Sequence, residues 1–243
     1  MIIGLIPARY QSSRLPGKPL LKFGNETMIQ KVYRQTLKSK KLDMVYVLTD
    51  DKRINNSITN INGNVLMVTK NCINGTERIC IALQKYPELF KNCKYIVNIQ
   101  GDEPFIDPSN IDIAINNLIN NDDKTVQCST LHYKIQKLDD LYNNSIGKLV
   151  INSNNYIMYC SRNCIPSNKN STYNLSKCSY YGHIGLFVFK INYLIKDYMK
   201  PNTPLQLEED IEWLKILEQN NNIITIEVDN YEIGVNVQED LSL

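Results

Sequence analysis

The sequence predicts a single α/β domain with a mostly parallel sheet flanked by helices, interrupted by an inserted hairpin region. Short apolar runs at 2–6, 44–50 and 95–99 are typical of buried strands. Stretches with helical spacing separate these runs, which implies βαβ units with right-handed crossovers. We found no internal repeat and no linker, so one domain covers 1–243, with an insertion at roughly 132–190.

The first half alternates strands and helices. Because parallel strands share one carboxyl edge, the loops after Ile6, Leu48 and Ile99 are expected to lie together. Met28, Ile29, Val32 and Leu37 recur at helical spacing and predict the first helix. The other expected elements are the strands 2–6, 44–50, 64–68 and 95–99, a polar helix at 51–60, and a helix opened by the loop 74–78 and continuing to about 86.

The second half begins with a helix after Asp107 and Pro108 and a strand at 126–131. A hairpin turned at Asn154 and Asn155 then marks the insertion. The hairpin strands are expected at 148–152 and 156–161, and a polar loop at 167–178. These are followed by a strand at 183–189, a helix that continues to about 199, a second amphipathic helix at 206–218 and a last strand at 223–228.

Composition narrows the function classes. A net charge of +2, from 27 basic and 25 acidic residues, argues against nucleic acid or an anionic membrane as the main partner. No run approaches the ~18 apolar residues of a membrane span, and the N-terminus opens into a strand, so we expect a cytoplasmic protein. The seven cysteines form no C-x-x-C pair, so we expect reduced and mostly buried thiols.

The loop from Pro7 to Leu20 carries three cations and two hydroxyls, namely Arg9, Arg14, Lys18, Ser12 and Ser13. Such groups, together with backbone amides, can bind a polyphosphate. Its spacing is neither that of a Walker A loop nor that of G-x-G-x-x-G. The alternative is a basic surface loop tightened by prolines, but the three cations of this loop are not offset by any acid as far as Gly24.

A second informative stretch, Gln100 to Pro104, follows the buried strand at 95–99. Asp102 near a polyphosphate could hold a Mg²⁺ ion that is bridged through phosphate oxygens. The alternative is that Asp102 only caps the turn. The basic loop expected at the same edge favours the metal.

Other candidates each carry an ordinary alternative. Gly75, Thr76 and Arg78 could present a helix N-terminus to a nucleotide, or Thr76 could simply be the N-cap. Lys148 and Arg162 suit an acidic second substrate, or they are surface cations. His183 lies in an apolar strand, where a core histidine is the usual outcome. The acidic residues within 208–212 are expected to form mostly a solvated face.

Three motifs, at 6–20, 74–78 and 98–104, resemble those of the 3-deoxy-manno-octulosonate (Kdo) cytidylyltransferase family. Later stretches follow the family order, so the resemblance covers nearly the whole chain. It implies a Rossmann-like nucleotidyltransferase fold, a homodimer and a role in lipopolysaccharide biosynthesis. The implied reaction is Mg²⁺-dependent transfer of CMP from CTP to the anomeric hydroxyl of a Kdo-like sugar acid, with release of pyrophosphate.

The resemblance also implies residue roles. Catalysis would depend on Arg9, Lys18 and Asp102, and the metal on Asp102 and Asn236. CTP would contact Pro7, Ala8, Arg9, Ser12, Lys18, Gly75, Arg78 and Gln100. The sugar acid would contact Arg14, Gln100, Lys148, Arg162, His183 and Glu209.

Three stretches, at 160–162, 212–215 and 234–241, depart from the family pattern. Asn236 replaces an aspartate that binds metal in the family, which predicts weaker metal binding. Cys160 and Trp213 differ on the sugar side, so a modified ulosonic acid such as 8-amino-Kdo is an alternative acceptor. A further alternative is a catalytically impaired nucleotide- or sugar-binding homologue.

Overall fold

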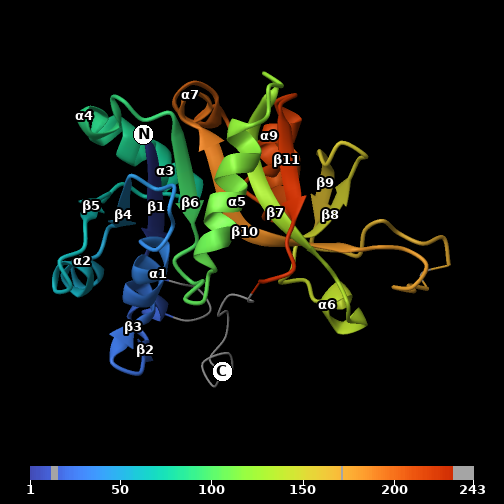
Figure 1. Cartoon of the computed structure of the whole chain (residues 1–243), viewed down its shortest axis with the longest axis horizontal. Helices are drawn as coiled ribbons and strands as arrows, with labels where there is room; N and C mark the ends of the chain where they lie inside the picture. The colour runs from blue at the N-terminus through green and yellow to red at the C-terminus, as the bar shows by residue number, and fades with distance from the viewer. Residues whose placement is uncertain (12–15, 171, 232–243) are drawn as a thin grey trace.

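The computed structural model describes residues 1–11, 16–170 and 172–231. Within these residues, the strands of the main sheet are arranged in the order β11-β7-β10-β6-β1-β4-β5, and the β8–β9 hairpin joins at β10 (Figure 1). The strands are β1 (Ile2–Ala8), β4 (Met44–Thr49), β5 (Val65–Met67), β6 (Tyr95–Ile99), β7 (Val126–Lys134), β8 (Lys148–Ile151), β9 (Ile157–Ser161), β10 (Tyr181–Lys190) and β11 (Asn222–Glu227), with a separate small pair β2 (Lys22–Phe23) and β3 (Glu26–Thr27).

The sheet is mostly parallel, as the sequence predicts. β1 lies between β6 and β4 and is parallel to both, and β4 is parallel to β5. β10 is the exception, because it pairs antiparallel with both β6 and β7. The loops that follow β1, β4 and β6 therefore meet at one edge of the sheet, which confirms the expectation drawn from Ile6, Leu48 and Ile99.

Helices cover both faces of the sheet (Figure 1). One apolar core lies against α1 (Met28–Thr36), α2 (Lys52–Thr59) and α5 (Pro108–Ile119). The other lies against α3 (Gly75–Lys85), α4 (Pro87–Phe90), α7 (Ile191–Tyr193), η2 (Leu194–Tyr198) and α9 (Leu214–Glu218). Leu5 and Ile6, which point to opposite faces of β1, are both fully buried, as expected of a central parallel strand.

Two helix predictions need correction. Asn74, and not Thr76, caps α3, because its Oδ1 accepts the N–H of Glu77 at 2.8 Å. The helix expected over 206–218 is two helices, α8 (Pro204–Glu209) and α9. Asp210 adopts φ 52° between them, and this left-handed residue ends α8 while Ile211 and Trp213 remain buried.

The hairpin region matches the prediction. β8 and β9 pair antiparallel, and Asn155 has φ 60° in the connecting turn, a conformation that asparagine tolerates. α6 (Leu138–Tyr142) precedes the hairpin. All seven cysteines are free thiols and four of them are buried, which agrees with the reduced state expected from the sequence. None of the described helices is long and apolar enough to cross a membrane.

Candidate active site

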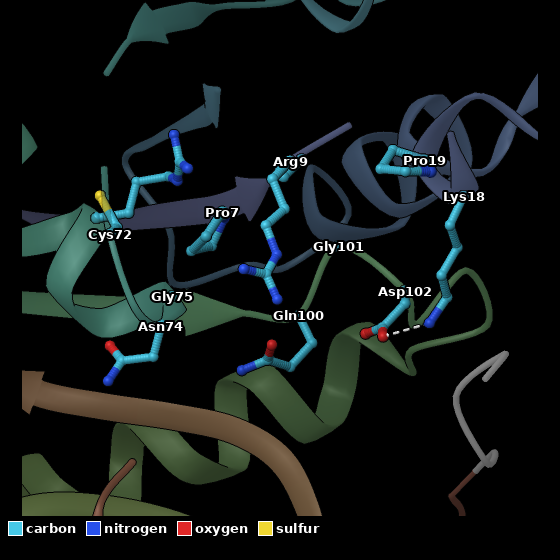
Figure 2. Close-up of a pocket in the computed structure, with 12 residues that line it drawn as sticks. Pro7, Arg9, Lys18, Pro19, Cys72, Asn74, Gly75, Gln100, Gly101 and Asp102 are labelled. Atoms are coloured by element: carbon cyan, nitrogen blue, oxygen red, sulfur yellow. Dashed lines mark hydrogen bonds and ion pairs between the residues drawn. The ribbon is translucent and has the colours of Figure 1, made fainter. Parts of the chain in front are cut away.

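A pocket lies at the carboxyl edge where the loops after β1 and β6 meet (Figure 2). This narrow pocket has a volume of about 230 Å³ and adjoins a wide pocket of about 780 Å³. Arg9, Gly75, Gln100 and Asp102 line both pockets, so the two form one continuous site. The narrow pocket is lined by Pro7, Ala8, Arg9, Lys18, Pro19, Cys72, Asn74, Gly75, Arg78, Gln100, Gly101 and Asp102.

Lys18 and Asp102 face each other at one end of the narrow pocket (Figure 2). The Lys18 ammonium donates to Asp102 Oδ2 at 2.6 Å, while the Asp102 side chain keeps 38% of its surface exposed. Lys18 begins a 3-10 turn, η1 (Lys18–Leu20), after Gly17, which adopts φ 75°. The sequence placed these two groups at one edge, and the structure brings them into direct contact.

Arg9 and Gln100 lie between the two pockets. The Arg9 side chain extends from the end of β1 toward Gln100 (Figure 2). Gly101 allows this close approach, because a Cβ there would lie 2.8 Å from the Pro7 carbonyl oxygen. The β1 and β6 ends therefore pack backbone to backbone, and their side chains are directed into a shared site.

Arg78 is buried and forms part of the lining of the narrow pocket. Its guanidinium donates to the Val68 carbonyl at 2.8 Å and to Asp50 Oδ2 at 3.2 Å. Gly75, in the first turn of α3, packs against the Pro7 ring. The nucleotide-side residues predicted from the 74–78 motif thus surround the same pocket as those of the basic loop.

Glu103, next to Asp102 in the chain, is a half-buried acid that lines the wide pocket. Burial, reinforced by the neighbouring Asp102 carboxylate, raises the pKa of Glu103 to about 8. Glu103 is therefore mostly protonated at neutral pH. A Cβ at Gly185 would lie 2.6 Å from Glu103 Oε1, so this glycine lets β10 pass close to the end of β6.

An aromatic wall of His183, Phe187 and Trp213 forms one side of the wide pocket. The ring centroids of His183 and Trp213 are 5.1 Å apart, and those of His183 and Phe187 are 4.9 Å apart. Burial lowers the pKa of His183 to about 3, and its Nε2 lies 2.9 Å from Thr130 Oγ1. His183 is thus a neutral imidazole that is half-buried and lines the pocket, rather than a core histidine enclosed on all sides.

Arg162 lines the wide pocket and joins three segments around it. Its guanidinium donates to the carbonyl oxygens of Ser145, Glu209 and Asp210. Those bonds use three of its five N–H groups. Arg162 therefore both holds the rim of the pocket together and retains donors for a ligand.

Lys148, predicted as a sugar contact, does not line either pocket. Its side chain is fully buried, and its ammonium donates to the carbonyl oxygens of Asn143, Ile146 and Arg162. The alternative of a surface cation is also wrong. Lys148 instead stabilises the 143–147 loop, because its ammonium donates to backbone carbonyl oxygens and does not face the pocket.

The structure reverses the locations that the sequence predicted for Glu209 and Glu212. Glu209, predicted as a sugar contact, is half-buried outside both pockets and accepts the N–H of Arg162 at 3.0 Å. Glu212, assigned to a solvated face, lines the wide pocket, and its Oε2 accepts the N–H of Thr76 at 3.1 Å. Helical spacing missed this because the helix is broken at Asp210. The apolar neighbours Ile211 and Trp213 were the available signal.

Three predicted site residues, Ser12, Arg14 and Asn236, lie outside the described residues. Across the described ranges, His, Cys, Asp and Glu form no group of three that could hold a metal. Of the two residues predicted to bind the metal, Asp102 is the one that the structure describes.

The fold and this site define a protein of the nucleotidyltransferase class, and comparisons identify its family. A family model described as cytidylyltransferase matches residues 3–227. The chain is 40% identical over 240 residues to 3-deoxy-manno-octulosonate cytidylyltransferase of Protochlamydia amoebophila, covering 99% of this chain and 91% of that protein. Its Fusobacterium nucleatum counterpart is 38% identical, with 98% and 93% covered.

A solved structure supports the same assignment. The structure of CMP:2-keto-3-deoxy-manno-octonic acid synthetase complexed with CTP matches with a TM-score of 0.88 and 30% identity, covering 99% of this chain and 95% of that one. The chain belongs to the 3-deoxy-manno-octulosonate cytidylyltransferase family.

Proposed function

We propose that the chain transfers CMP from CTP to the anomeric hydroxyl of a Kdo-like sugar acid and releases pyrophosphate. The observation that carries this proposal is the continuity of the two pockets at Arg9, Gln100 and Asp102. One pocket offers cations for a triphosphate, and the other offers polar groups and an aromatic wall for a sugar. The family assignment supports the same reaction.

In this reaction the sugar oxygen forms a bond to the α-phosphorus while the bond from that phosphorus to the bridging oxygen breaks. The electron pair leaves with pyrophosphate, and the hydroxyl proton is released. Arg9 and Lys18 would stabilise the charge that accumulates on the phosphates. Lys18 would exchange part of its contact with Asp102 for a phosphate oxygen. Gln100, between the pockets, would orient the two substrates.

Mg²⁺ fits the residues present, with Asp102 as its protein ligand. Mg²⁺ is commonly held by one or two carboxylates, with phosphates and water completing its shell. Asp102 presents a part-exposed carboxylate beside the cations that would bind the phosphates, and the Lys18 ammonium lies 2.6 Å from it. When bound, Mg²⁺ would neutralise charge on the phosphate oxygens and so assist departure of pyrophosphate.

In the wide pocket, neutral His183 would exchange hydrogen bonds with sugar hydroxyls without adding charge. Arg162 would pair with the acceptor carboxylate through its remaining N–H groups. Phe187 and Trp213 would pack against the C–H face of the sugar ring and exclude water from it. These roles divide the site into a charged half for CTP and a mixed half for the acceptor.

A second acceptor, an amino-substituted ulosonic acid, is favoured by one observation. Asp210 and Glu212 both line the wide pocket; burial is the main cause of the raised pKa of Glu212, and the charge of Asp210 raises it further. A cationic amino group on the acceptor would relieve that repulsion. We therefore propose 8-amino-Kdo as the alternative acceptor.

The test is pyrophosphate release from CTP, with and without Mg²⁺, using Kdo, 8-amino-Kdo and a sialic acid as separate acceptors. Release with either Kdo-type acid supports the proposal, and the ratio of kcat/KM values identifies the preferred acceptor. Tight CTP binding without release from any acceptor would instead indicate an impaired binding homologue. The homodimer, the link to lipopolysaccharide and the cytoplasmic location stay predictions, and light scattering would test the first.

A further inference from the structure

We propose that Arg53, which lines neither pocket, is a positioning residue for Arg9 and Lys18 and acts through the ring of Tyr10. This inference rests on the proposed binding of CTP phosphates by those two cations. It adds to the site a residue from α2, an element that the 6–20 motif does not include.

Arg53 is held in place by Asp51, the N-cap of α2. Asp51 Oδ1 accepts the backbone N–H of Arg53 at 2.8 Å and its Nε–H at 3.0 Å. Asp51 Oδ2 accepts from the Arg53 terminal nitrogen at 2.7 Å. A two-pronged pair of this kind fixes the plane of a guanidinium even where the side chain is largely exposed, as Arg53 is at 58%.

The fixed guanidinium lies over Tyr10. The central guanidinium carbon is 3.3 Å from the centroid of the Tyr10 ring, well within the range of a cation–π contact. Tyr10 in turn contacts Gly17, where a Cβ would lie 3.1 Å from the Tyr10 hydroxyl oxygen and 3.2 Å from ring carbons. The Tyr10 ring is therefore bounded by Arg53 and by the backbone of Gly17.

Tyr10 and Gly17 are also joined through their backbones. The N–H of Gly17 donates to the Tyr10 carbonyl at 2.8 Å, and Gly17 adopts φ 75° to do so. Arg9 precedes Tyr10 and Lys18 follows Gly17, so this junction sets where both cations leave the main chain. Because electrostatic stabilisation of phosphates depends on fixed donor positions, a loosened Tyr10 should weaken both contacts together.

The experiment compares Arg53→Gln with Arg34→Gln, a matched control. Arg34 is 56% exposed and pairs with Glu26 at 3.0 Å, so both changes remove an exposed and paired arginine. Arg53→Gln is expected to raise the KM for CTP about two- to fivefold, the size of an exposed cation–π contact. Acceptor KM and melting temperature should change little, and Arg34→Gln should leave the KM for CTP unchanged.

A second pair of variants tests the route through Tyr10. Tyr10→Phe keeps the ring and should raise the KM for CTP less than Tyr10→Leu, which removes the ring. The double variant of Arg53→Gln and Tyr10→Leu should be no worse than Tyr10→Leu alone, because both changes remove one contact.

Three results would overturn the inference. These are an unchanged KM for CTP in Arg53→Gln, an equal rise in Arg34→Gln, and full additivity of Arg53→Gln with Tyr10→Leu. Calorimetric titration with CTP separates this inference from the proposed function. If wild type binds CTP but releases no pyrophosphate with any acceptor, the proposed reaction fails. The ratio of CTP dissociation constants between Arg53→Gln and wild type then still decides the role of Arg53.

Discussion

The ammonium of Lys18 lies 2.6 Å from Oδ2 of Asp102, although 84 residues separate them in the chain. The pair joins the loop after β1 to the loop after β6 at the edge where the narrow pocket opens. A lysine neutralised by a carboxylate is ready to exchange that partner for a phosphate. In the proposed reaction, the same carboxylate would then be free to bind Mg²⁺.

We expect Lys18→Gln to lower kcat/KM for CTP by roughly 100-fold or more, because removing one preorganised charge donor typically costs this much.

Asp102→Asn should instead raise the Mg²⁺ concentration needed for half-maximal rate. Steady-state pyrophosphate assays over a Mg²⁺ series distinguish the two. An Asp102→Asn enzyme with an unaltered Mg²⁺ requirement would exclude Asp102 as the metal ligand.

Glu212→Gln should reduce kcat/KM for the acceptor by roughly 10-fold or more, since hydrogen bonds to charged groups are worth about 1.5–3 kcal/mol. Glu209→Gln is the matched control, because Glu209 lies outside both pockets. Its effect on acceptor kinetics should be several-fold smaller. If the two variants lose equal activity, the assignment of Glu212 to the acceptor pocket is wrong.

Lys148→Met should destabilise the protein by about 1–3 kcal/mol, because it leaves three backbone carbonyl oxygens, one of them buried, without their donor. Lys190→Met is the comparison, since Lys190 is half-buried and makes one long bond of 3.4 Å to the Asp123 carbonyl. Urea unfolding measures both. Equal midpoints for Lys148→Met and wild type would contradict this account.

Histidine burial should make the protein acid-sensitive. Burial lowers the pKa of His132 to about 4, and its Nδ1 lies 2.9 Å from Thr225 Oγ1 in the core. The unfolded chain binds a proton at this residue below about pH 6.5, but the folded chain does not until about pH 4. The free energy of unfolding that depends on neutral His132 is therefore retained above about pH 6.5 and is lost as the pH falls from about 6.5 to about 4.

By this linkage, His132 alone should cost roughly 2 kcal/mol of unfolding free energy on going from pH 7 to pH 5. His132→Gln should shrink the measured difference between urea unfolding at the two pH values by that amount. His183 remains in the variant and retains its own contribution. A pH dependence identical to that of wild type would show that the pKa of His132 is the same in the folded and the unfolded chain.

Much of the fold could be predicted from local patterns. The apolar runs at 2–6 and 95–99 are strands because a central parallel strand is buried on both faces, and β1 and β6 show this burial. The direction of β10 could not be predicted in this way. Its residues are equally apolar in either direction, and pairing with β6 and β7 was decided by the connections through the insertion.

The candidate site also has a part that could be predicted from the sequence and a part that could not. The charged half could be predicted from the chain alone, because Arg9, Lys18 and Asp102 follow strands that must end at one edge. The half proposed to bind the acceptor depends on contacts between distant segments. Lys148 turns inward to backbone carbonyls, and Glu212 enters the pocket in place of Glu209 because Asp210 breaks the helix. Local periodicity reports which residues share a face, but long-range packing decides what that face meets.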